Sequence, residues 1–358
     1  MPGRGPTEPQ NYGPYKITGK LGRGGMASVY KAVHAPDGKV VALKVFLAEQ
    51  LTSPEFFRRA KREIVALQMC SHPNILKVHG FKLDASGGYL AVDFIDGQNL
   101  QELVDKGGKF NQDQLLRISR DVGGALAYCH ARGLFHRDIK PGNIMVLRAT
   151  GKAIILDFGI VKATNMTQIS AIGGAIMGTL SYMAPEQFLG KEVDGRTDLY
   201  QVGLVLYKLA TGEDPPPVSD LVEGVDIPDR PPPLKPIRAV NPSISEGMTT
   251  IIGNCIHPDP GQRYPSAHHF LDDIDKVSKG KPVAVVKAER TTKKFKIDPA
   301  AKVGKGEQTL KMTKAMRPPS LPPVAPAPEG HRKWVIVAIG LSPLVVLILV
   351  ALVLYLRR

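Results

Sequence analysis

Two polar clusters, fourteen residues apart, carry the side chains of this chain that are best suited to chemistry. The first runs His136-Arg-Asp-Ile-Lys-Pro-Gly-Asn143, and the second is Asp157-Phe-Gly159. Each follows an apolar run, so each is expected in a loop held beside buried elements. Transfer of a phosphoryl group needs one carboxylate to take a hydroxyl proton and further oxygen ligands for a divalent cation. Asp138 suits the first requirement, and Asn143 with Asp157 suits the second.

Each cluster also has an ordinary explanation. An aspartate often caps a turn, and Asp157-Phe-Gly159 is a common way for a strand to end. For either cluster alone that explanation is the better one. Together, in this order and with the upstream groups described next, the two clusters favour the catalytic interpretation.

A glycine-rich segment and a lysine supply groups suited to phosphates. In Gly22-Arg-Gly-Gly-Met-Ala-Ser28, glycines let backbone amides approach phosphate oxygens, although a plain hairpin turn explains them too. The strand-like residues that follow disfavour a dinucleotide-binding turn, which leads into a helix. Lys44 lies in an apolar strand, where it needs a partner unless it extends along an edge to solvent. Glu63 is a candidate partner, although it is also explained as a solvated charge on its helix.

Hydrophobic periodicity predicts the elements that must position these groups. Strands are predicted over 15–21, 28–33, 41–46, 75–81 and 89–94, and helices over 54–70, 100–105, 112–130, 199–210, 247–256 and 265–276. A small strand-rich part is therefore followed by a larger helical part, which is an α+β organisation. The boundary falls near 93–97, a suitable place for a nucleotide base.

The second polar cluster opens a long segment with little periodicity. Residues 160–177 are rich in Thr, Ser, Gly, Ala and Met, so we predict a mobile loop. Thr164, Thr167 and Ser170 are candidate phosphorylation sites, although most hydroxyl side chains in loops are only polar filler.

Three charged residues lie beyond this loop. Glu186 ends the run 178–186 and would be costly if it were buried without a partner, for which Arg263 is the candidate. Asp198 begins an apolar helix, where an acidic residue also suits the helix dipole.

The net charge is concentrated in one segment. Residues 276–333 carry fifteen Lys or Arg against four Asp or Glu, and 357–358 are both arginine, so only +1 of the total of +14 belongs to residues 1–275. The charge therefore gives no support for a nucleic-acid-binding core, and we expect no nucleic acid among the partners. The length of 358 residues allows one large domain or two smaller ones.

The cysteines and the N-terminus indicate a reducing compartment. Cys70, Cys129 and Cys255 are far apart, odd in number and form no Cys-x-x-Cys pair, so we expect buried or idle thiols, with no disulfide and no zinc site. Residues 1–14 are polar and rich in Gly and Pro, and we predict a disordered tail there without an apolar leader.

These motifs, in this order and spacing, resemble the protein kinase family, specifically the bacterial eukaryotic-like (Hanks-type) Ser/Thr kinases. The resemblance covers residues 15–275. It rests on the glycine-rich segment, Val41-Ala-Leu-Lys44, Glu63 with His72-Pro-Asn-Ile75, the two polar clusters, Ala184-Pro-Glu186, Asp198 and Arg263. Lys140, two residues after Asp138, and Thr179 in Gly-Thr-x-x-Tyr match the Ser/Thr-specific form of the family and disfavour a tyrosine kinase.

The resemblance implies a two-lobe fold with ATP in the cleft, together with Mg²⁺ or Mn²⁺. Lys44, held by Glu63, would contact the α- and β-phosphates. Asp138 would orient the substrate hydroxyl and take its proton, and Lys140 would offset charge on the transferring group. Asn143 and Asp157 would hold the metal.

The resemblance also assigns nucleotide contacts and a regulatory residue. The nucleotide-binding positions are Leu21, Gly22, Arg23, Gly24, Gly25, Met26, Ala27, Ser28, Val29, Ala42, Lys44, Val92, Asp93 and Ile95. Among these, Asp93 and Ile95 would offer backbone groups to adenine, with Val92 as gatekeeper. Ala27 departs from the family pattern, which has a third glycine there. Arg137 resembles the arginine that pairs with a phosphorylated loop, which implies autophosphorylation between Thr164 and Thr179.

The C-terminal residues predict a membrane anchor. Residues 276–333, basic and rich in proline, indicate a flexible linker that is either a solubilising spacer or a binder of anionic headgroups. Residues 334–356 contain 23 residues without a charge, about 34 Å as a helix, which is enough to cross a hydrocarbon core of ~30 Å. A buried core helix is the alternative, but this segment has no core to join. Trp334 and Tyr355 near its ends suit the two membrane interfaces.

The excess of Lys and Arg before this segment predicts its orientation. By the positive-inside rule the kinase-like part would face the cytoplasm, with Arg357 and Arg358 opposing only weakly. We therefore expect a single-pass protein of the cell membrane (inner or plasma), in contact with its lipid and with no folded domain after the helix.

Two other functions share these motifs. A catalytically inactive kinase fold used as a scaffold is disfavoured because every catalytic position is filled. A small-molecule kinase is disfavoured by the complete segment 178–186, which borders the peptide groove in protein kinases. We expect a Ser/Thr protein kinase that acts on protein substrates including itself, with a dimer as a candidate arrangement for phosphorylation in trans.

Overall fold

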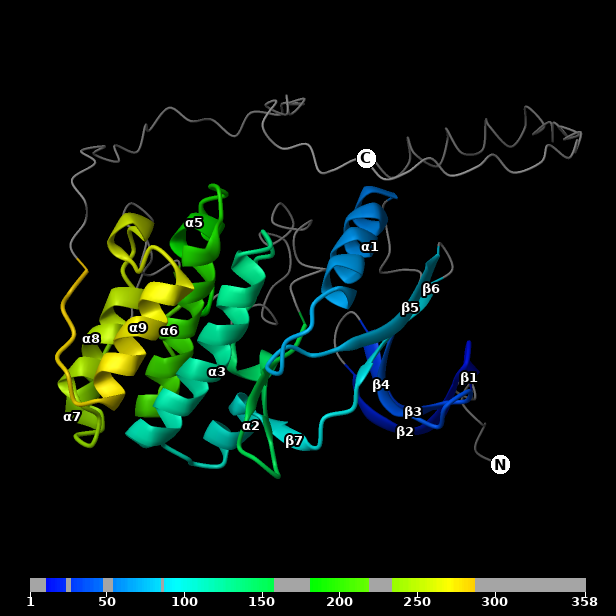
Figure 1. The fold of residues 1–358 in the computed structure, drawn as a ribbon, viewed down its shortest axis with the longest axis horizontal. Coiled ribbons are helices and arrows are strands. Elements are labelled where there is room, and N and C mark those ends of the chain that lie inside the picture. The colour runs from blue at the N-terminus through cyan, green and yellow to red at the C-terminus, as the bar shows by residue number, and fades with distance from the viewer. Residues whose placement is uncertain are drawn as a thin grey trace, which may run out of the picture. The chain divides into compact units, whose positions relative to one another are not determined.

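An antiparallel sheet of six strands forms the N-terminal part of the computed structural model, which describes residues 11–23, 27–47, 54–84, 87–157, 181–218 and 234–286. In spatial order the strands are β1 (Asn11–Tyr12), β2 (Tyr15–Arg23), β3 (Ala27–His34), β4 (Val40–Leu47), β6 (Gly87–Asp93) and β5 (Val78–Asp84). Helix α1 (Pro54–Gln68) packs against β5 (Figure 1). The predicted small strand-rich lobe is confirmed.

Alternation along β4 decides which face of the sheet each side chain occupies. Val41, Leu43 and Val45 are buried on one face, where they form a small core with Tyr15 and Tyr30. Successive side chains of a strand point to opposite faces, so Lys44 is turned away from this core. The apolar run predicted to contain a single lysine therefore presents that lysine on the face opposite the N-lobe core.

The predicted disordered tail, residues 1–14, is wrong at its C-terminal end. Asn11 and Tyr12 form β1, paired with β2, and Gly13 makes the turn between them with a φ of 56°. The Tyr12 ring stacks on Tyr30 with centroids 6.5 Å apart. This aromatic contact spans eighteen residues of sequence, so local composition did not show it.

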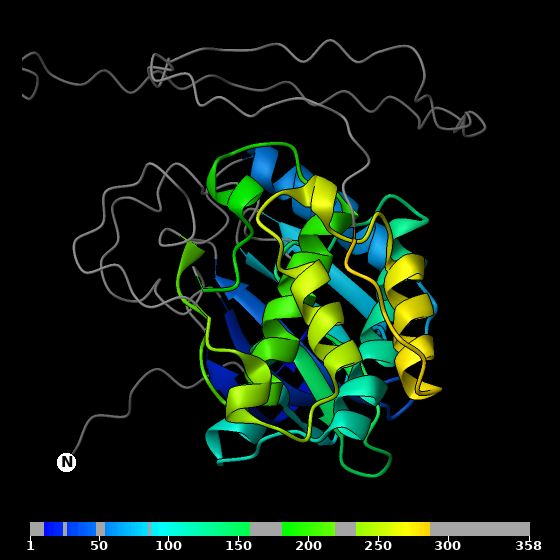
Figure 2. The same ribbon diagram turned by 90° about the vertical axis from the view of Figure 1, so that its left-hand side faces the viewer.

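The C-terminal lobe combines a small sheet with a bundle of helices. The sheet is β7 (Gly97–Asn99), β8 (Ile144–Leu147) and β9 (Ala153–Ile155). The helices are α2 (Leu100–Asp105), α3 (Gln112–His130), α5 (Pro185–Phe188), α6 (Gly195–Thr211), α7 (Ile237–Val240), α8 (Glu246–Cys255) and α9 (Ala267–Ser278). Helices α3, α6, α8 and α9 lie side by side (Figures 1 and 2).

Helix α6 is the central element of this lobe. Every residue from Thr197 to Thr211 is buried, which agrees with an apolar sequence on all sides. Asp194 caps its N-terminus, and Gly212, with a φ of 79°, ends it in a left-handed conformation that glycine adopts readily. The predicted helix over 199–210 is confirmed and extends one turn further at the N-terminal end.

Side-chain caps explain why two helices were predicted with correct bounds. The Asn99 side chain accepts from the Glu102 N–H at the start of α2. Asn111 and Gln114 exchange two hydrogen bonds at the start of α3, which form a capping box. Both signals are local, so periodicity and capping residues together were sufficient.

The chain remains attached to the C-lobe beyond the predicted boundary at 275. Helix α9 continues to Ser278, and Val283 and Val286 pack against the lobe. Asn254 on α8 donates to the Ala284 carbonyl at 3.0 Å and accepts from the Val286 N–H at 3.0 Å. We call residues 279–286 the strap. The first eleven residues of the predicted linker, 276–286, therefore belong to the folded part.

The predicted membrane segment, 334–356, and residues 287–333 of the predicted linker lie outside the described residues. Among the helices that the structure describes, none combines the length and the apolar character needed to cross a bilayer.

Candidate active site

The loop between α3 and β8 carries the first polar cluster and is fixed by its buried histidine. His136 is fully buried, and its Nε2–H donates to the Leu156 carbonyl at 2.8 Å. Its Nδ1 accepts from the Asp138 N–H at 3.2 Å. One ring therefore joins the loop of Asp138 to the residue that precedes Asp157, which brings the two predicted clusters together.

Asp198 holds the same loop from α6. Its carboxylate is fully buried and accepts from the backbone N–H groups of His136 at 2.9 Å and Arg137 at 2.7 Å. His130 Nε2–H donates to it at 2.8 Å. The helix-dipole explanation weighed for Asp198 is therefore insufficient, because the carboxylate is used by the loop.

Asp138, Lys140 and Asn143 meet on this loop. The Asn143 amide donates to Asp138 Oδ2 at 2.9 Å and to the Asp138 carbonyl at 2.8 Å. Lys140 Nζ lies 3.5 Å from the same Oδ2. Pro141–Asn143 form a single 3₁₀ turn, which places the two side chains on the side of Asp138. A carboxylate held by an amide and a lysine can accept a proton from a hydroxyl bound beside it.

Lys44 and Asp157 join the two lobes. Lys44 Nζ donates to Asp157 Oδ2 at 2.9 Å, and these side chains are 23% and 46% exposed. The Leu156 N–H donates to the Asn143 carbonyl at 2.8 Å. Asp157 therefore directly follows a residue tied to the loop of residues 136–143, which is the candidate catalytic loop. Four predicted residues, Lys44, Asp138, Asn143 and Asp157, are therefore linked by contacts within one site.

Lys44 has a contact that the sequence did not predict. Its ammonium pairs with the Asp157 carboxylate. Glu63, the predicted partner, lies on α1 and is partly buried with interactions of its own. The pairing of Lys44 with Glu63 stays a prediction.

The oxygen ligands present suit a magnesium ion. Asn143 uses its amide nitrogen in its bonds to Asp138, which leaves the amide oxygen for a metal. Asp157 bonds Lys44 through Oδ2. Mg²⁺ usually takes one or two protein oxygen ligands together with phosphates and water, so this pair of side chains fits it.

The predicted nucleotide-binding residues gather on neighbouring strands. In the register of the sheet, Gly22 is opposite Val29, Val29 is opposite Lys44, and Ala42 is opposite Val92. Leu21 on β2 is 48% exposed. Ala27, Ser28 and the backbone of Arg23 lie where β2 and β3 end and begin. Gly24, Gly25 and Met26 lie outside the described residues.

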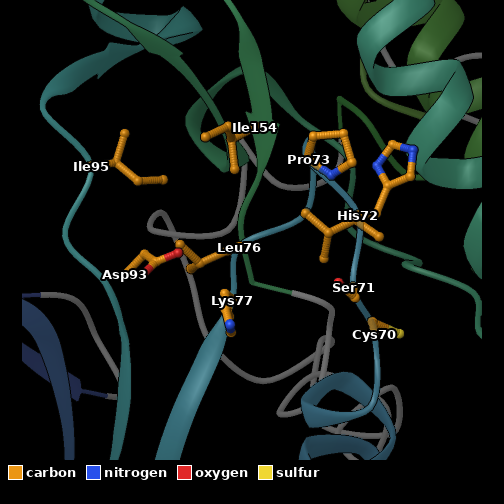
Figure 3. A pocket seen from close by; sticks show the side chains of 10 residues that line it. Cys70, Ser71, His72, Pro73, Leu76, Lys77, Asp93, Ile95 and Ile154 are labelled. Atoms are coloured by element: carbon orange, nitrogen blue, oxygen red, sulfur yellow. The ribbon is translucent and has the colours of Figure 1, made fainter.

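Figure 3 shows a pocket of about 280 Å³ at the connection between the lobes. The side chains of Asp93 and Ile95 point into it, opposite those of His72 and Pro73. The Asp93 N–H donates to the Lys77 carbonyl at 3.0 Å. Since the adenine contacts predicted for Asp93 and Ile95 use main-chain groups, side chains placed in this pocket are compatible with that prediction.

The predicted pair of Glu186 and Arg263 is confirmed. Arg263 donates to both carboxylate oxygens of Glu186, at 2.8 and 2.9 Å, and Thr197 donates at 2.7 Å. Burial acts to raise the pKa of Glu186, but the hydrogen bonds and charge of Arg263 outweigh it, so the pKa lies below its ordinary value. Arg263 thus ties α5, which carries the end of the segment 178–186, to the loop before α9, and Thr197 ties it to α6.

Comparison with known proteins matches residues 15–273 to the model of the family described as "Protein kinase domain". The chain belongs to the protein kinase family. It is 36% identical to a probable serine/threonine-protein kinase of Streptomyces coelicolor, over 77% of this chain and 42% of that protein. It is also 36% identical to the serine/threonine-protein kinase Pkn1 of Myxococcus xanthus, over 73% of this chain and 38% of that protein.

A solved kinase structure shows the same fold. The PknI kinase domain of Mycobacterium tuberculosis matches with a TM-score of 0.59 and 28% identity, over 74% of this chain and 97% of that one. The predicted two-lobe kinase fold is confirmed, and this kinase domain is of the serine/threonine type. The chain spans about two-fifths of the length of the first curated relatives it matches.

Several predicted kinase residues lie outside the described part of the chain. They are Phe158, Gly159, Thr164, Thr167, Ser170 and Thr179. Two residues that the sequence reasoning missed, Gln187 and Gln201, bond the catalytic loop directly. A polar residue inside the apolar run 199–210 was the one sequence signal for Gln201.

The three cysteines are buried and free, as predicted, and burial raises the pKa of Cys129 to about 12.

Proposed function

We propose that this chain is a Ser/Thr protein kinase that transfers the γ-phosphoryl group of ATP to hydroxyl groups of proteins. The observation that carries the proposal is the joint geometry of the catalytic loop and the two lobes. Asp138 is held by Asn143 and Lys140, and Lys44 from the small sheet meets Asp157 from the large lobe. The family match and the names of the relatives support the same reaction.

In the proposed reaction the substrate hydroxyl gives its proton to the Asp138 carboxylate. A bond forms between that oxygen and the γ-phosphorus, and the bond from this phosphorus to the bridging oxygen breaks, which releases ADP. Lys140, 3.5 Å from Asp138, offsets charge on the group in transfer. Mg²⁺, held by Asn143 and Asp157, would neutralise charge on the phosphates, and Lys44 would bind the α- and β-phosphates.

Autophosphorylation forms part of the proposal. Arg137 follows the buried His136, and its Nε is buried without a hydrogen-bond partner among the residues that the structure describes. A guanidinium with unused donor capacity beside the catalytic loop suits a phosphorylated side chain. The hydroxyl would come from the segment between Thr164 and Thr179, and a dimer would allow the transfer in trans.

A membrane location also belongs to the proposal and rests on the sequence. The uncharged residues 334–356 would form a single-pass anchor, and the basic residues before them would keep the kinase on the cytoplasmic side. The remaining basic linker, 287–333, would lie near anionic headgroups. Retention of the full chain in the membrane fraction after an alkaline wash, and its release when 334–356 are deleted, would support this part. Equal extraction of both proteins would contradict it.

The catalytic proposal is tested by labelling with γ-³²P-ATP and Mg²⁺, using the full chain on itself and on a generic basic protein. Wild type should transfer label to protein, while Asp138→Asn should fall by about 10²–10⁴-fold because it has no base. Asp113→Asn, an exposed position on α3, serves as the control and should match wild type. Equal labelling by wild type and Asp138→Asn contradicts the proposal, and label found in small molecules alone would indicate a different kinase class.

A further inference from the structure

Two glutamines from different helices hold the backbone on both sides of Asp138. Gln201 lies on α6 and is 2% exposed, and Gln187 lies on α5 and is partly buried. Neither is among the residues assigned above to the proton transfer, the metal or the nucleotide. Both side chains converge on the same short stretch of backbone, Arg137–Ile139.

The side-chain amides of the two glutamines form hydrogen bonds with both peptide groups that flank Asp138. Gln201 Oε1 accepts from the Ile139 N–H at 2.8 Å, which fixes the peptide after Asp138. The carbonyl of Arg137, in the peptide before Asp138, accepts from Gln187 Nε2 at 3.0 Å and from Gln201 Nε2 at 3.3 Å. These bonds hold both peptides beside Asp138. The Asn143 amide in turn restrains the Asp138 side chain.

The two amides also bond each other and a third element. Gln201 Nε2 donates to Gln187 Oε1 at 3.0 Å, and the Ala184 N–H donates to the same oxygen at 3.1 Å. Ala184 precedes Pro185 and Glu186, at the end of the segment 178–186. The pair therefore connects the catalytic loop both to the central helix α6 and to the end of the segment that borders the substrate side in the proposed kinase.

The local backbone needs such support. Arg137 has a φ of 65°, and it is the one residue other than glycine with a positive φ in the described part of the chain. Residues with a side chain avoid this conformation, so it persists where the surroundings over-determine it. Asp198 holds the N–H side of Arg137, and the two glutamines hold its carbonyl side.

Packing alone does not explain a glutamine at position 201. The rest of α6 from Leu199 to Leu209 is mostly apolar, and a buried amide without hydrogen bonds is unfavourable in such a place. A leucine or methionine would fill the same volume without that requirement. The amide is therefore best explained by the bonds that it makes to the catalytic loop.

We propose that Gln201 and Gln187 are positioning residues that set the orientation of Asp138 through the two peptides beside it. The inference rests on the proposed kinase function. Loss of either amide shifts the carboxylate relative to the substrate hydroxyl and slows the transfer, while ATP, bound by other residues, keeps its affinity.

The test compares full-length variants that replace one amide by a side chain of similar size. Gln201→Met and Gln187→Met each remove bonds to the loop. Gln112→Met is the matched control, because Gln112 Oε1 accepts from the Ser245 N–H at 2.7 Å and thus joins two elements away from Asp138. For each protein, kcat and KM for ATP are measured, together with the melting temperature and the deuterium exchange of the peptide containing 136–140.

Gln201→Met should lower kcat by roughly 10- to 100-fold, as expected for a misplaced catalytic group, with KM for ATP within about twofold. Gln187→Met should lower kcat by a smaller factor, since Gln201 still donates to the Arg137 carbonyl. Both should speed exchange within 136–140, whereas Gln112→Met should lower the melting temperature without changing kcat or that exchange.

The possible failures are distinguishable. If wild type is active and Gln201→Met retains its kcat, or falls no further than Gln112→Met, the positioning role is wrong and the kinase function stands. If wild type labels protein no better than Asp138→Asn, both proposals are wrong. If Gln201→Met does not fold, Gln187→Met decides by the same two readouts, kcat and exchange.

Discussion

Asp198 shows how much of the geometry of the loop around Asp138 depends on one buried side chain. Its carboxylate is fully buried and takes two backbone N–H groups and one imidazole N–H. A carboxylate has the acceptor capacity for all three donors. An amide of the same shape has one oxygen, and its nitrogen would face a donor.

We therefore expect Asp198→Asn to unfold more easily and to lose activity. Buried donors left without an acceptor, together with the lost charge, predict a destabilisation of about 2–4 kcal/mol. The activity should fall more than tenfold, since the loop of Asp138 loses its anchor. Thermal unfolding and protein labelling measure the two effects, with Asp113→Asn as the exposed control. A variant as stable and active as wild type would contradict the role of Asp198.

The ion pair of Glu186 and Arg263 predicts a pH dependence. The folded-state pKa of Glu186 lies below its ordinary value of about 4.3, so the pair contributes stability above that pH. This contribution is lost as the pH falls through the folded-state pKa. We expect Glu186→Gln to lower the free energy of unfolding by about 3–5 kcal/mol at pH 7, because Arg263 stays buried without its charge partner.

The difference between wild type and Glu186→Gln should narrow as the pH falls below about 4. Urea unfolding at a series of pH values measures it. Glu192→Gln, at an exposed position near the same helix, should stay within about 0.5 kcal/mol of wild type. A difference that widens on acidification would show that the carboxylate is not stabilised in its charged form.

At this scale the sequence was informative where chemistry restricts residue type. Asp138, Asn143 and Asp157 could be named as candidates because metal binding and proton transfer need oxygen atoms. The structure brings Asp138 and Asn143 into contact and ties Asn143 to Leu156, the residue before Asp157. The contact of Lys44 with Asp157 was not predictable, since 113 residues separate the two and only the folded geometry brings their atoms within 2.9 Å.

At the scale of elements, close approach between helices is a feature of the C-lobe. A Cβ placed on Gly203 of α6 would lie 2.6 Å from the Cys255 Cβ of α8 and 2.7 Å from an Ile256 methyl carbon. Neither neighbour is the end of a long flexible side chain. The glycine therefore sets the distance between α6 and α8.

Gly203→Ala should destabilise the protein by about 1–3 kcal/mol, because the added methyl overpacks the contact with α8. Gly253→Ala is the matched control on α8, where a Cβ meets nothing within 4 Å. It should instead stabilise the protein by up to about 1 kcal/mol through the lower entropy of the unfolded chain. Chemical unfolding measures both. The same sign for the two variants would contradict the packing argument.

Element bounds were predictable from sequence where local signals decide them. Asn99 and Asn111 cap the helices that follow, and periodicity marks their length. Strand β1 and the strap were missed because Tyr12 and Val286 are fixed by residues far away in the sequence, Tyr30 and Asn254. The α+β organisation followed from periodicity, whereas the two-lobe kinase fold was inferred from the family resemblance.

At the scale of the whole molecule, the strap is the last segment of the chain that the structure describes. Val283 packs against the C-lobe, while Val285 is 70% exposed. A substitution at Val283 therefore tests attachment of the strap, and the same substitution at Val285 controls for the change in the composition of the strap.

Val283→Asp should release the strap in the full chain, because a charge would be placed against the apolar lobe. Trypsin should then cut after Lys279, which Gly280 follows, at least several-fold faster than in wild type, since proteases need a locally opened chain. Val285→Asp carries the same charge on the exposed side and should be cut at the wild-type rate. Mass spectrometry of timed digests identifies the sites, and equal cleavage of both variants would show that the strap is not held.

If residues 334–356 form the proposed membrane anchor, attachment of the strap also sets an outer limit on where the kinase can act. Counting starts at Val286, the last residue that the structure describes, so forty-eight residue steps separate it from Trp334, the first residue of the proposed anchor. At no more than ~3.6 Å per residue this allows a distance of at most about 170 Å, whatever path the chain takes. A substrate that never comes within that radius of the bilayer, plus the width of the domain itself, would be out of range.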